Sequence, residues 1–114
     1  MLVIDDDPSY LALATQVLKG LGAEPVTTAA DARTAIEVAN DVRPDAALVD
    51  VWLPDRSGID LAYELAALPW RPRVILMSTD TDAASAIKAR GENALPFIPK
   101  ERLAGATLRR LLTS

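Results

Sequence analysis

Polar residues suited to chemistry stand at the end of each strongly apolar run of this sequence. Asp5, Asp6 and Asp7 follow the run 2–4, Asp50 follows 46–49, Ser78 and Thr79 follow 73–77, and Lys100 closes the run 95–100. Adjacent carboxylates repel each other, by about 1 kcal/mol at 4 Å in bulk water and several-fold more near a protein surface. A bound cation relieves this repulsion, and ligation by oxygen atoms from a few carboxylates suits Mg²⁺, which keeps waters and bridges to phosphate oxygens.

The same residue types suit phosphoryl transfer. Lys100 offers a point charge to a carboxylate or phosphate, and the Ser78 hydroxyl can donate a hydrogen bond to a phosphoryl oxygen. Such a pocket stabilises the charge of a transferring phosphoryl group while a carboxylate acts as the nucleophile. Because Asp5 and Asp6 form the acidic pair suited to a metal, we expect Asp50 to be the nucleophile.

The elements that must position these residues alternate between strand and helix. We expect strands at 2–4, 24–28, 46–49, 73–77 and 95–100, and helices at 8–21, 30–40, 58–68, 82–90 and 103–112. Three of the strands are continuous apolar runs, which indicates a parallel α/β sheet with helices on both faces. Ligands of such sheets bind outside the carboxyl ends of the strands, so we expect the polar residues above to converge there.

Local signals place several element boundaries. Asp7 is expected to cap the first helix, with Pro8 at its first position. The segment "TAAD" from Thr28 predicts a capping box for the second helix, and Pro25 marks the second strand as an edge strand. Asp55 and Arg56 are expected to be turn residues, followed by Gly58, which supplies permissive dihedral angles.

Composition bounds the class of protein. The chain has 114 residues, of which 50% are hydrophobic and 25% charged, so residues 1–114 are expected to form a single domain. Its net charge is −4, and it contains no cysteine and no histidine. We therefore expect no disulfide, no thiolate or imidazole metal site, no direct nucleic-acid binding and, without a long apolar run or a leader, no membrane segment. These features favour a cytoplasmic protein.

The motifs resemble those of the receiver domains of two-component response regulators. The matching stretches are "LVIDDDP", "ALVDVWLPDRSGIDL", "RVILMS" and "FIPK", in family order over essentially the whole chain. The resemblance implies a flavodoxin-like (βα)5 doubly wound parallel sheet with strand order 2-1-3-4-5. It also implies a phosphoryl-accepting signalling domain that is not an enzyme beyond assisting its own phosphorylation and dephosphorylation.

The resemblance also implies a metal site and an acceptor. Asp5 and Asp6, with Asp6 as the more direct ligand, would hold Mg²⁺ or Mn²⁺ together with Asp50 and the backbone carbonyl of Trp52. Asp50 would accept the phosphoryl group from a phosphohistidine. Asp7 is better explained as a helix cap than as a ligand.

Further positions carry the family's switching roles. Ser78 would bond the phosphoryl oxygen and move on activation, Lys100 would pair with the phosphoaspartate, and Phe97 would swing inward with the hydroxyl or simply belong to the core. The surface switched would lie around 82–90, 95–100 and 103–112. Trp52 and Asp80 occupy the positions that influence loss of the phosphoryl group.

The sequence departs from the family in three places. The lysine of most receivers is followed by proline, often in a cis peptide, whereas Glu101 follows Lys100 and Pro99 precedes it. The first strand begins almost at Met1, and the bulky Trp52 replaces a small or polar residue. A shielding indole would prolong the phosphorylated state, although packing of Trp52 on the loop and helix is an equal alternative.

The expected partners follow from the absence of histidine. The phosphodonor must be another molecule, namely a sensor histidine kinase, a histidine phosphotransfer protein or a small acyl phosphate, and a downstream effector reads the result; a homodimer is a further candidate assembly. One alternative is a degenerate receiver that binds proteins without phosphorylation. A phosphoaspartyl-type hydrolase using Asp5 and Asp7 is another, but the chain leaves no room for the cap that such enzymes need.

Overall fold

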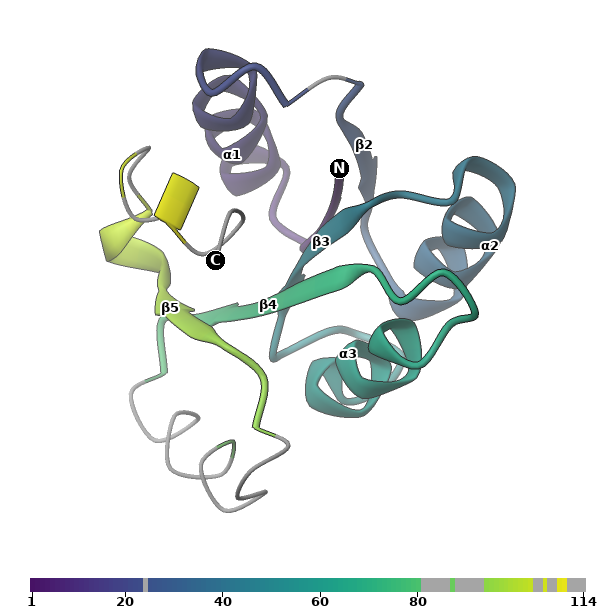
Figure 1. Cartoon of the computed structure of the whole chain (residues 1–114). Helices are drawn as coiled ribbons and strands as arrows, with labels where there is room; N and C mark the ends of the chain where they lie inside the picture. The colour runs from purple at the N-terminus through teal and green to yellow at the C-terminus, as the bar shows by residue number, and fades with distance from the viewer. Residues whose placement is uncertain (24, 81–86, 88–93, 104–105, 107–108, 111–114) are drawn as a thin grey trace.

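Five parallel strands form one sheet in the order β2-β1-β3-β4-β5 (Figure 1). The computed structural model describes residues 1–23, 25–80, 87, 94–103, 106 and 109–110. The strands are β1 (Leu2–Ile4), β2 (Thr27–Ala29), β3 (Ala46–Asp50), β4 (Arg73–Ser78) and β5 (Phe97–Pro99). The helices are α1 (Pro8–Gly20), α2 (Ala32–Val42), α3 (Gly58–Ala66) and the short 3₁₀ helix η2 (Lys100–Arg102). The predicted fold class and strand order are confirmed.

Helices cover both faces of the sheet, and each face has its own buried layer (Figure 1). On one face α1 packs through Ala14 and Leu18 against Val3, Leu48 and Ile75 of the strands. On the other face α2 and α3 pack against the side chains that point the opposite way. This second layer includes Leu2, Ile4, Ala35, Ala39, Val49, Leu61, Leu65 and Leu76. Burial on both faces explains why the central strands are apolar throughout rather than alternating.

The first helix begins as its sequence predicts. Asp7 is the N-cap of α1 and accepts a hydrogen bond from the Ser9 N–H, while Pro8 occupies the first turn, where no N–H is needed. At the other end, the amide of Ala23 donates to the Leu18 carbonyl, and Gly22 adopts φ +80°. A glycine at this left-handed position ends the helix without a side-chain clash.

The predicted start of the second helix is wrong by two residues. We expected 30–40 with Thr28 in a capping box, but α2 spans Ala32–Val42, and its N-cap is Asp31, which accepts from the Thr34 N–H. Thr28 cannot cap the helix because it pairs with Val3 as part of the edge strand β2. The expected strand 24–28 is correspondingly displaced to Thr27–Ala29.

The expected helices 82–90 and 103–112 lie mostly outside the described residues. Ile87 is buried in the layer that contains α2 and α3, and Leu103 packs with the layer of α1. Within the described part of the chain, no helix has the length and apolar character that crossing a membrane requires.

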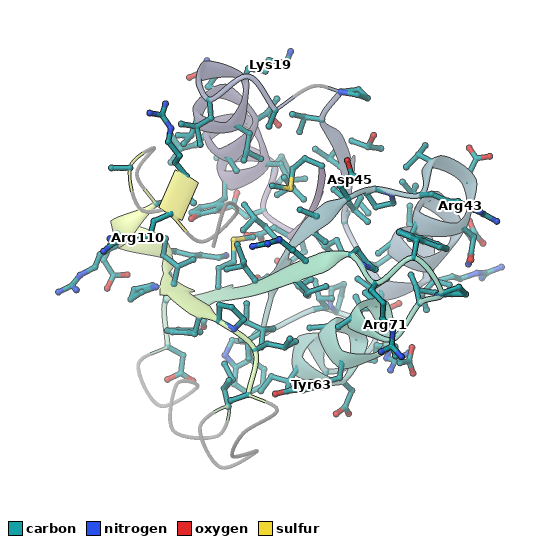
Figure 2. The ribbon with its side chains drawn as sticks, viewed as in Figure 1. Lys19, Arg43, Asp45, Tyr63, Arg71 and Arg110 are labelled. Carbon is teal, nitrogen blue, oxygen red and sulfur yellow. The ribbon has the colours of Figure 1, made fainter. Side chains whose placement is uncertain are left out.

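The amino edge of the sheet is built from two tight connections (Figure 2). Arg43 before β3 and Arg71 before β4 both take left-handed backbone conformations, with φ of 45° and 49°. Trp70 joins these connections: its indole N–H donates to the Pro44 carbonyl at 3.0 Å, and the Arg43 guanidinium lies 5.3 Å from the ring centroid. These contacts fix the amino ends of β3 and β4, and therefore the register at their carboxyl ends.

Asp55 and Arg56, predicted only as turn residues, connect the loop between β3 and α3 to two helices. Asp55 accepts hydrogen bonds from the Ala32 and Arg33 amides at the start of α2, at 2.9 and 3.0 Å. Arg56 pairs through both guanidinium nitrogens with Glu64 of α3, at 3.0 and 2.8 Å. The loop that follows Asp50 is thus tied to two helices.

Gly58 is required where this loop enters α3. A Cβ at position 58 would overlap the backbone carbonyl of Asp50 and lie 2.8 Å from the carbonyl oxygen of Val51. The Gly58 amide also donates to the Val51 carbonyl at 2.8 Å. The helix start therefore lies against the backbone of the strand that ends at Asp50.

Replacing Gly58 by alanine should destabilise the protein by about 1–3 kcal/mol or more, because the backbone atoms it would strike cannot move independently of the sheet. Urea unfolding followed by circular dichroism measures the change. Gly20→Ala is the matched control: a Cβ at this helical position meets nothing within 4 Å, so the variant should be neutral or slightly more stable. Equal stability of the two variants would contradict the proposed close packing at Gly58.

Candidate functional site

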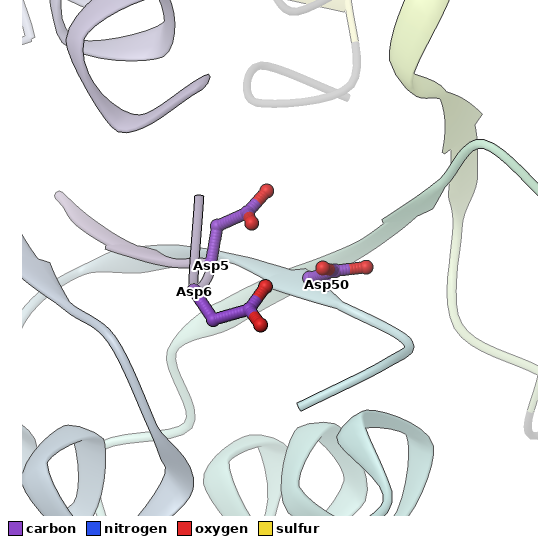
Figure 3. Close-up of side chains that lie close together, drawn as sticks. All are labelled: Asp5, Asp6 and Asp50. Carbon is purple, nitrogen blue, oxygen red and sulfur yellow. The ribbon is translucent and has the colours of Figure 1, made fainter. Parts of the chain in front are cut away.

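Three carboxylates meet at the carboxyl edge of the sheet (Figure 3). Asp5, Asp6 and Asp50 each offer a carboxylate oxygen within 4.8 Å of the others. The register of the sheet causes this meeting, since Ile4 pairs with Val49 and the next residue on each strand is an aspartate. The predicted acidic cluster is therefore present, and Asp7 is excluded from it as the N-cap of α1.

Asp5 is held rigidly inside the protein. Its side chain is fully buried, its Oδ1 accepts from the Asp7 amide at 3.0 Å, and its own amide donates to the Ala29 carbonyl at 3.1 Å. Its Oδ2 is buried and has no well-aligned hydrogen bond among the described residues, although the Lys100 ammonium lies 2.6 Å away. Asp6, by contrast, is exposed.

Asp50 is almost as buried, at 5% exposure. Its Oδ1 accepts from the Trp52 amide at 3.2 Å, and its Oδ2 faces the Lys100 ammonium at 3.2 Å. Burial, followed by the negative charge of Asp5, raises the pKa of Asp50, and Lys100 opposes this rise. A carboxylate whose charge is disfavoured by its surroundings has much to gain from a nearby cation.

Lys100 is the cation that the chain itself provides. Its side chain is only 12% exposed and its ammonium bridges the carboxylates of Asp5 and Asp50. Burial lowers the pKa of Lys100, but the contact with Asp5 and the charges of Asp50 and Asp5 outweigh it and hold the pKa above its ordinary value. Lys100 is therefore charged at neutral pH, and the described pocket still holds three carboxylates against one ammonium.

Ser78 ends β4 and is buried at 1% exposure. Its Oγ accepts a hydrogen bond from the Asp80 amide at 2.9 Å. Because the oxygen serves as the acceptor, the hydroxyl proton remains able to donate to a bound group. Asp80 itself is partly buried directly after the strand.

Trp52 lies on the rim of the site with 63% of the residue exposed. Its backbone forms an isolated antiparallel bridge with Ser57, so the peptide is fixed while the indole faces solvent. The expectation that Trp52 packs on the loop and helix is not favoured by this exposure. Phe97, the candidate switch residue, is half-buried and packs against the core layer of α2 and α3.

Two residues hold parts of the site in place, a role that the sequence did not predict for them. Tyr10 donates its hydroxyl to the Lys100 carbonyl at 3.2 Å, and its ring centroid lies 4.6 Å from the Lys100 ammonium. Asp55 fastens the loop that carries Trp52 to α2. The available sequence signal for Tyr10 is its place in the predicted first helix, about one turn after the acids.

These residues fit a divalent cation. The buried Asp5 Oδ2 without a well-aligned hydrogen bond, the exposed Asp6, and Asp50, whose Oδ2 faces Lys100, form a donor set of oxygen atoms with one exposed member. Mg²⁺ prefers such sets, in which a few carboxylates leave room for water and phosphate oxygens. The chemistry of the donors thus agrees with the magnesium expected from the sequence.

Comparison with known proteins identifies the family. The sequence model of the response regulator receiver domain matches residues 1–112. The chain is 37% identical over 108 residues to the DNA-binding response regulator MtrA of Mycolicibacterium smegmatis, covering 91% of this chain and 47% of that protein. It is 34% identical to the DNA-binding transcriptional regulator NtrC of Azospirillum brasilense, covering 88% of this chain and 21% of that one. The chain thus spans half or less of the length of these relatives.

Solved structures agree. The signal receiver domain of a modulated diguanylate cyclase from Desulfovibrio desulfuricans superposes with a TM-score of 0.82 at 27% identity, over 96% of this chain and 86% of that one. The chemotaxis protein CheY4 of Vibrio cholerae gives 0.80 at 26% identity, over 97% and 96%. With the strand order, the family match and these neighbours in agreement, the chain belongs to the receiver domains of two-component response regulators.

Proposed function

We propose that this receiver domain accepts a phosphoryl group on Asp50 in a reaction that requires Mg²⁺. The observation that carries the proposal is the meeting of Asp5, Asp6 and Asp50 within 4.8 Å, with the Lys100 ammonium between two of them. This arrangement supports phosphoryl transfer because it concentrates positive and metal-binding groups around one rigidly held carboxylate.

The transfer itself needs little covalent chemistry from the protein. An oxygen of Asp50 attacks the phosphorus of a phosphohistidine, the new O–P bond forms as the N–P bond breaks, and the electron pair returns to the imidazole of the donor. Lys100 pairs with an oxygen of the transferred group, and the Ser78 hydroxyl donates to another. Because these 114 residues contain no histidine, the donated phosphoryl group comes from outside them, from a histidine kinase, a phosphotransfer protein or a small acyl phosphate.

Asp5, Asp6, Asp50 and the Trp52 carbonyl would hold the metal. When bound, Mg²⁺ supplies charge neutralisation for the phosphoryl oxygens and for the acids themselves. The position of the Trp52 carbonyl is supported by the Trp52–Ser57 bridge and by the Asp55 contacts to α2. Asp6, exposed beside the buried pair, is the ligand that remains open to solvent.

Phosphorylation would be read at the β5 end of the sheet. A phosphoryl group on Asp50 would draw Lys100 and the Ser78 hydroxyl toward it, and Phe97 would follow the hydroxyl as the switch residue. An effector protein, whether attached or separate, would recognise the altered surface. The relatives MtrA and NtrC are described as DNA-binding proteins. The function proposed for residues 1–114 is phosphoryl acceptance and contact with other proteins.

The direct test is phosphorylation by a small acyl phosphate with Mg²⁺. The wild type should gain one base-labile phosphate, and Asp50→Asn should gain none. Asp41→Asn, which removes an exposed carboxylate at the end of α2, should behave as the wild type. Wild-type protein that remains folded and acquires no phosphate would reject the proposal in favour of a degenerate, phosphorylation-independent binding module.

The affinity for Mg²⁺ should distinguish Asp6, a proposed metal ligand, from Asp7, the N-cap of α1. Asp6→Asn should weaken Mg²⁺ binding about tenfold or more, since it removes a charged ligand, whereas Asp7→Ser keeps a capping side chain and should alter the affinity only slightly. Titration followed by the fluorescence of Trp52, or by calorimetry, gives both dissociation constants. Equal weakening in the two variants would mean that general negative charge, and not ligation by Asp6, holds the ion.

Trp52 should lengthen the phosphorylated state by covering the acyl phosphate with its indole ring. Phosphate release from the phosphorylated protein should accelerate several-fold in Trp52→Asn, because a small polar side chain admits water to the phosphorus. Val42→Asn, which removes an exposed apolar side chain at the amino edge of the sheet, serves as the control. Identical release rates in all three proteins would remove the shielding role.

A further inference from the structure

Lys100 is held by a turn that differs from the one expected in its family. Most receivers place proline after this lysine, but here Glu101 follows it, and residues Lys100–Arg102 form η2 with the Leu103 amide donating to the Lys100 carbonyl at 3.2 Å. A proline at position 101 would disfavour the helical backbone of the residue before it. Lys100 thus belongs to a 3₁₀ turn that directly follows β5.

Tyr10 contacts both ends of that lysine. The phenol hydroxyl donates to the Lys100 carbonyl at 3.2 Å, across 90 positions of sequence. The ring centroid lies 4.6 Å from the Lys100 ammonium, within the range of a cation–π contact. One side chain thus fixes the backbone of Lys100 and the position of its charge.

The acids lie directly before the helix that carries Tyr10. Asp5 and Asp6 precede α1 directly, and the Asp7 cap fixes the first turn through the Ser9 amide and the Leu11 amide, both at 3.0 Å. The Lys100 ammonium consequently meets Asp5 at 2.6 Å and the Tyr10 ring from the same helix start, and Asp50 at 3.2 Å from β3. The position of Lys100 relative to the acids is set by the start of α1 as much as by β5 and η2.

We propose that Tyr10 is a positioning residue for Lys100 and that it fixes both the backbone and the ammonium of that lysine. The proposal rests on the proposed function of Lys100 as the partner of the phosphoryl group on Asp50. Tyr10 acts only through the lysine. Burial and the charges of Asp5 and Asp50 raise the pKa of the Tyr10 phenol, so the hydroxyl is a donor throughout the neutral range.

Graded variants measure the effect on phosphorylation. Tyr10→Phe keeps the ring and loses the hydrogen bond, and should slow phosphorylation by a small acyl phosphate about threefold to tenfold, the size expected for one neutral hydrogen bond. Tyr10→Leu also loses the ring face and should slow it roughly tenfold or more. Mg²⁺ affinity should stay within about twofold of the wild type in both, because metal binding uses the acids and not Lys100.

Tyr63→Phe is the matched control. The chain has two tyrosines, and Tyr63 of α3 accepts a hydrogen bond from the Leu95 amide at 3.1 Å, a length close to that made by Tyr10 (Figure 2). Its hydroxyl serves the face of the sheet opposite α1. Tyr63→Phe loses a comparable hydrogen bond and should cost comparable stability. It should nevertheless leave the phosphorylation rate unchanged, because Tyr63 does not contact Lys100.

A double-mutant cycle separates positioning from general support. If Tyr10 acts through Lys100, Tyr10→Leu should have no further effect on the rate in a Lys100→Ala background, because the partner is already gone. An equal factor in both backgrounds would overturn the proposal.

One measurement stands apart from phosphorylation. In the wild type the ring of Tyr10 should shift the ε-methylene protons of Lys100 upfield in the NMR spectrum, and Tyr10→Leu should abolish this shift while Tyr63→Phe preserves it. Ordinary lysine shifts in the wild type would refute the positioning role even if Asp50 is phosphorylated. Conversely, a lost shift without any phosphorylation would leave Tyr10 as the positioning residue and reject the function proposed for the pocket.

Discussion

Carboxylates crowded at one edge of a parallel sheet are the constraint on which this molecule is built. Ile4 pairs with Val49, so the next residues, Asp5 and Asp50, are carried to the same place by the ladder of β1 and β3. Both are buried, and burial raises the pKa of Asp50. The fold holds them there through rigid backbone contacts, and Lys100 neutralises only part of the charge.

The connections around this edge act as supports for it. The Asp5 amide donates to the Ala29 carbonyl, and the Val51 amide donates to the Met77 carbonyl at 3.0 Å, which extends the ladder one residue beyond the acids. Gly58 allows α3 to begin against the Asp50 backbone. Asp55 and Tyr10 then hold the Trp52 loop and Lys100 from neighbouring helices. A cation and a phosphoryl group would meet a site that is already arranged.

Much of this arrangement was predictable from the sequence. Continuous apolar runs ending in polar residues predict parallel strands whose carboxyl ends meet, and this predicts that Asp5, Asp6, Asp50 and Lys100 lie together. The Asp7–Pro8 pair likewise predicted the start of α1 correctly. The apolar pattern of the strands and the capping signal of Asp7 and Pro8 were sufficient to predict the sheet edge and the start of α1.

The rest depends on contacts between segments far apart in sequence. The capping box predicted from Thr28 is wrong because Thr28 pairs with Val3 in β2. Asp31 caps α2 instead. Asp55 reaches Ala32 across 23 positions and Tyr10 reaches Lys100 across 90, and no pattern of residue types predicts such pairs. Local patterns predicted which polar residues meet at the carboxyl edge of the sheet, whereas tertiary packing decides which residues hold them in place.

The central claim is that Asp50 is the carboxylate that takes the phosphoryl group. Reduction of the phosphorylated protein with borohydride converts an acyl phosphate to an alcohol, and peptide mass spectrometry then locates the converted residue. If Asp50 is the acceptor, conversion should occur at position 50 alone and only when Mg²⁺ was present during phosphorylation. Conversion at Asp5 or Asp6, or equal conversion without the metal, would contradict it.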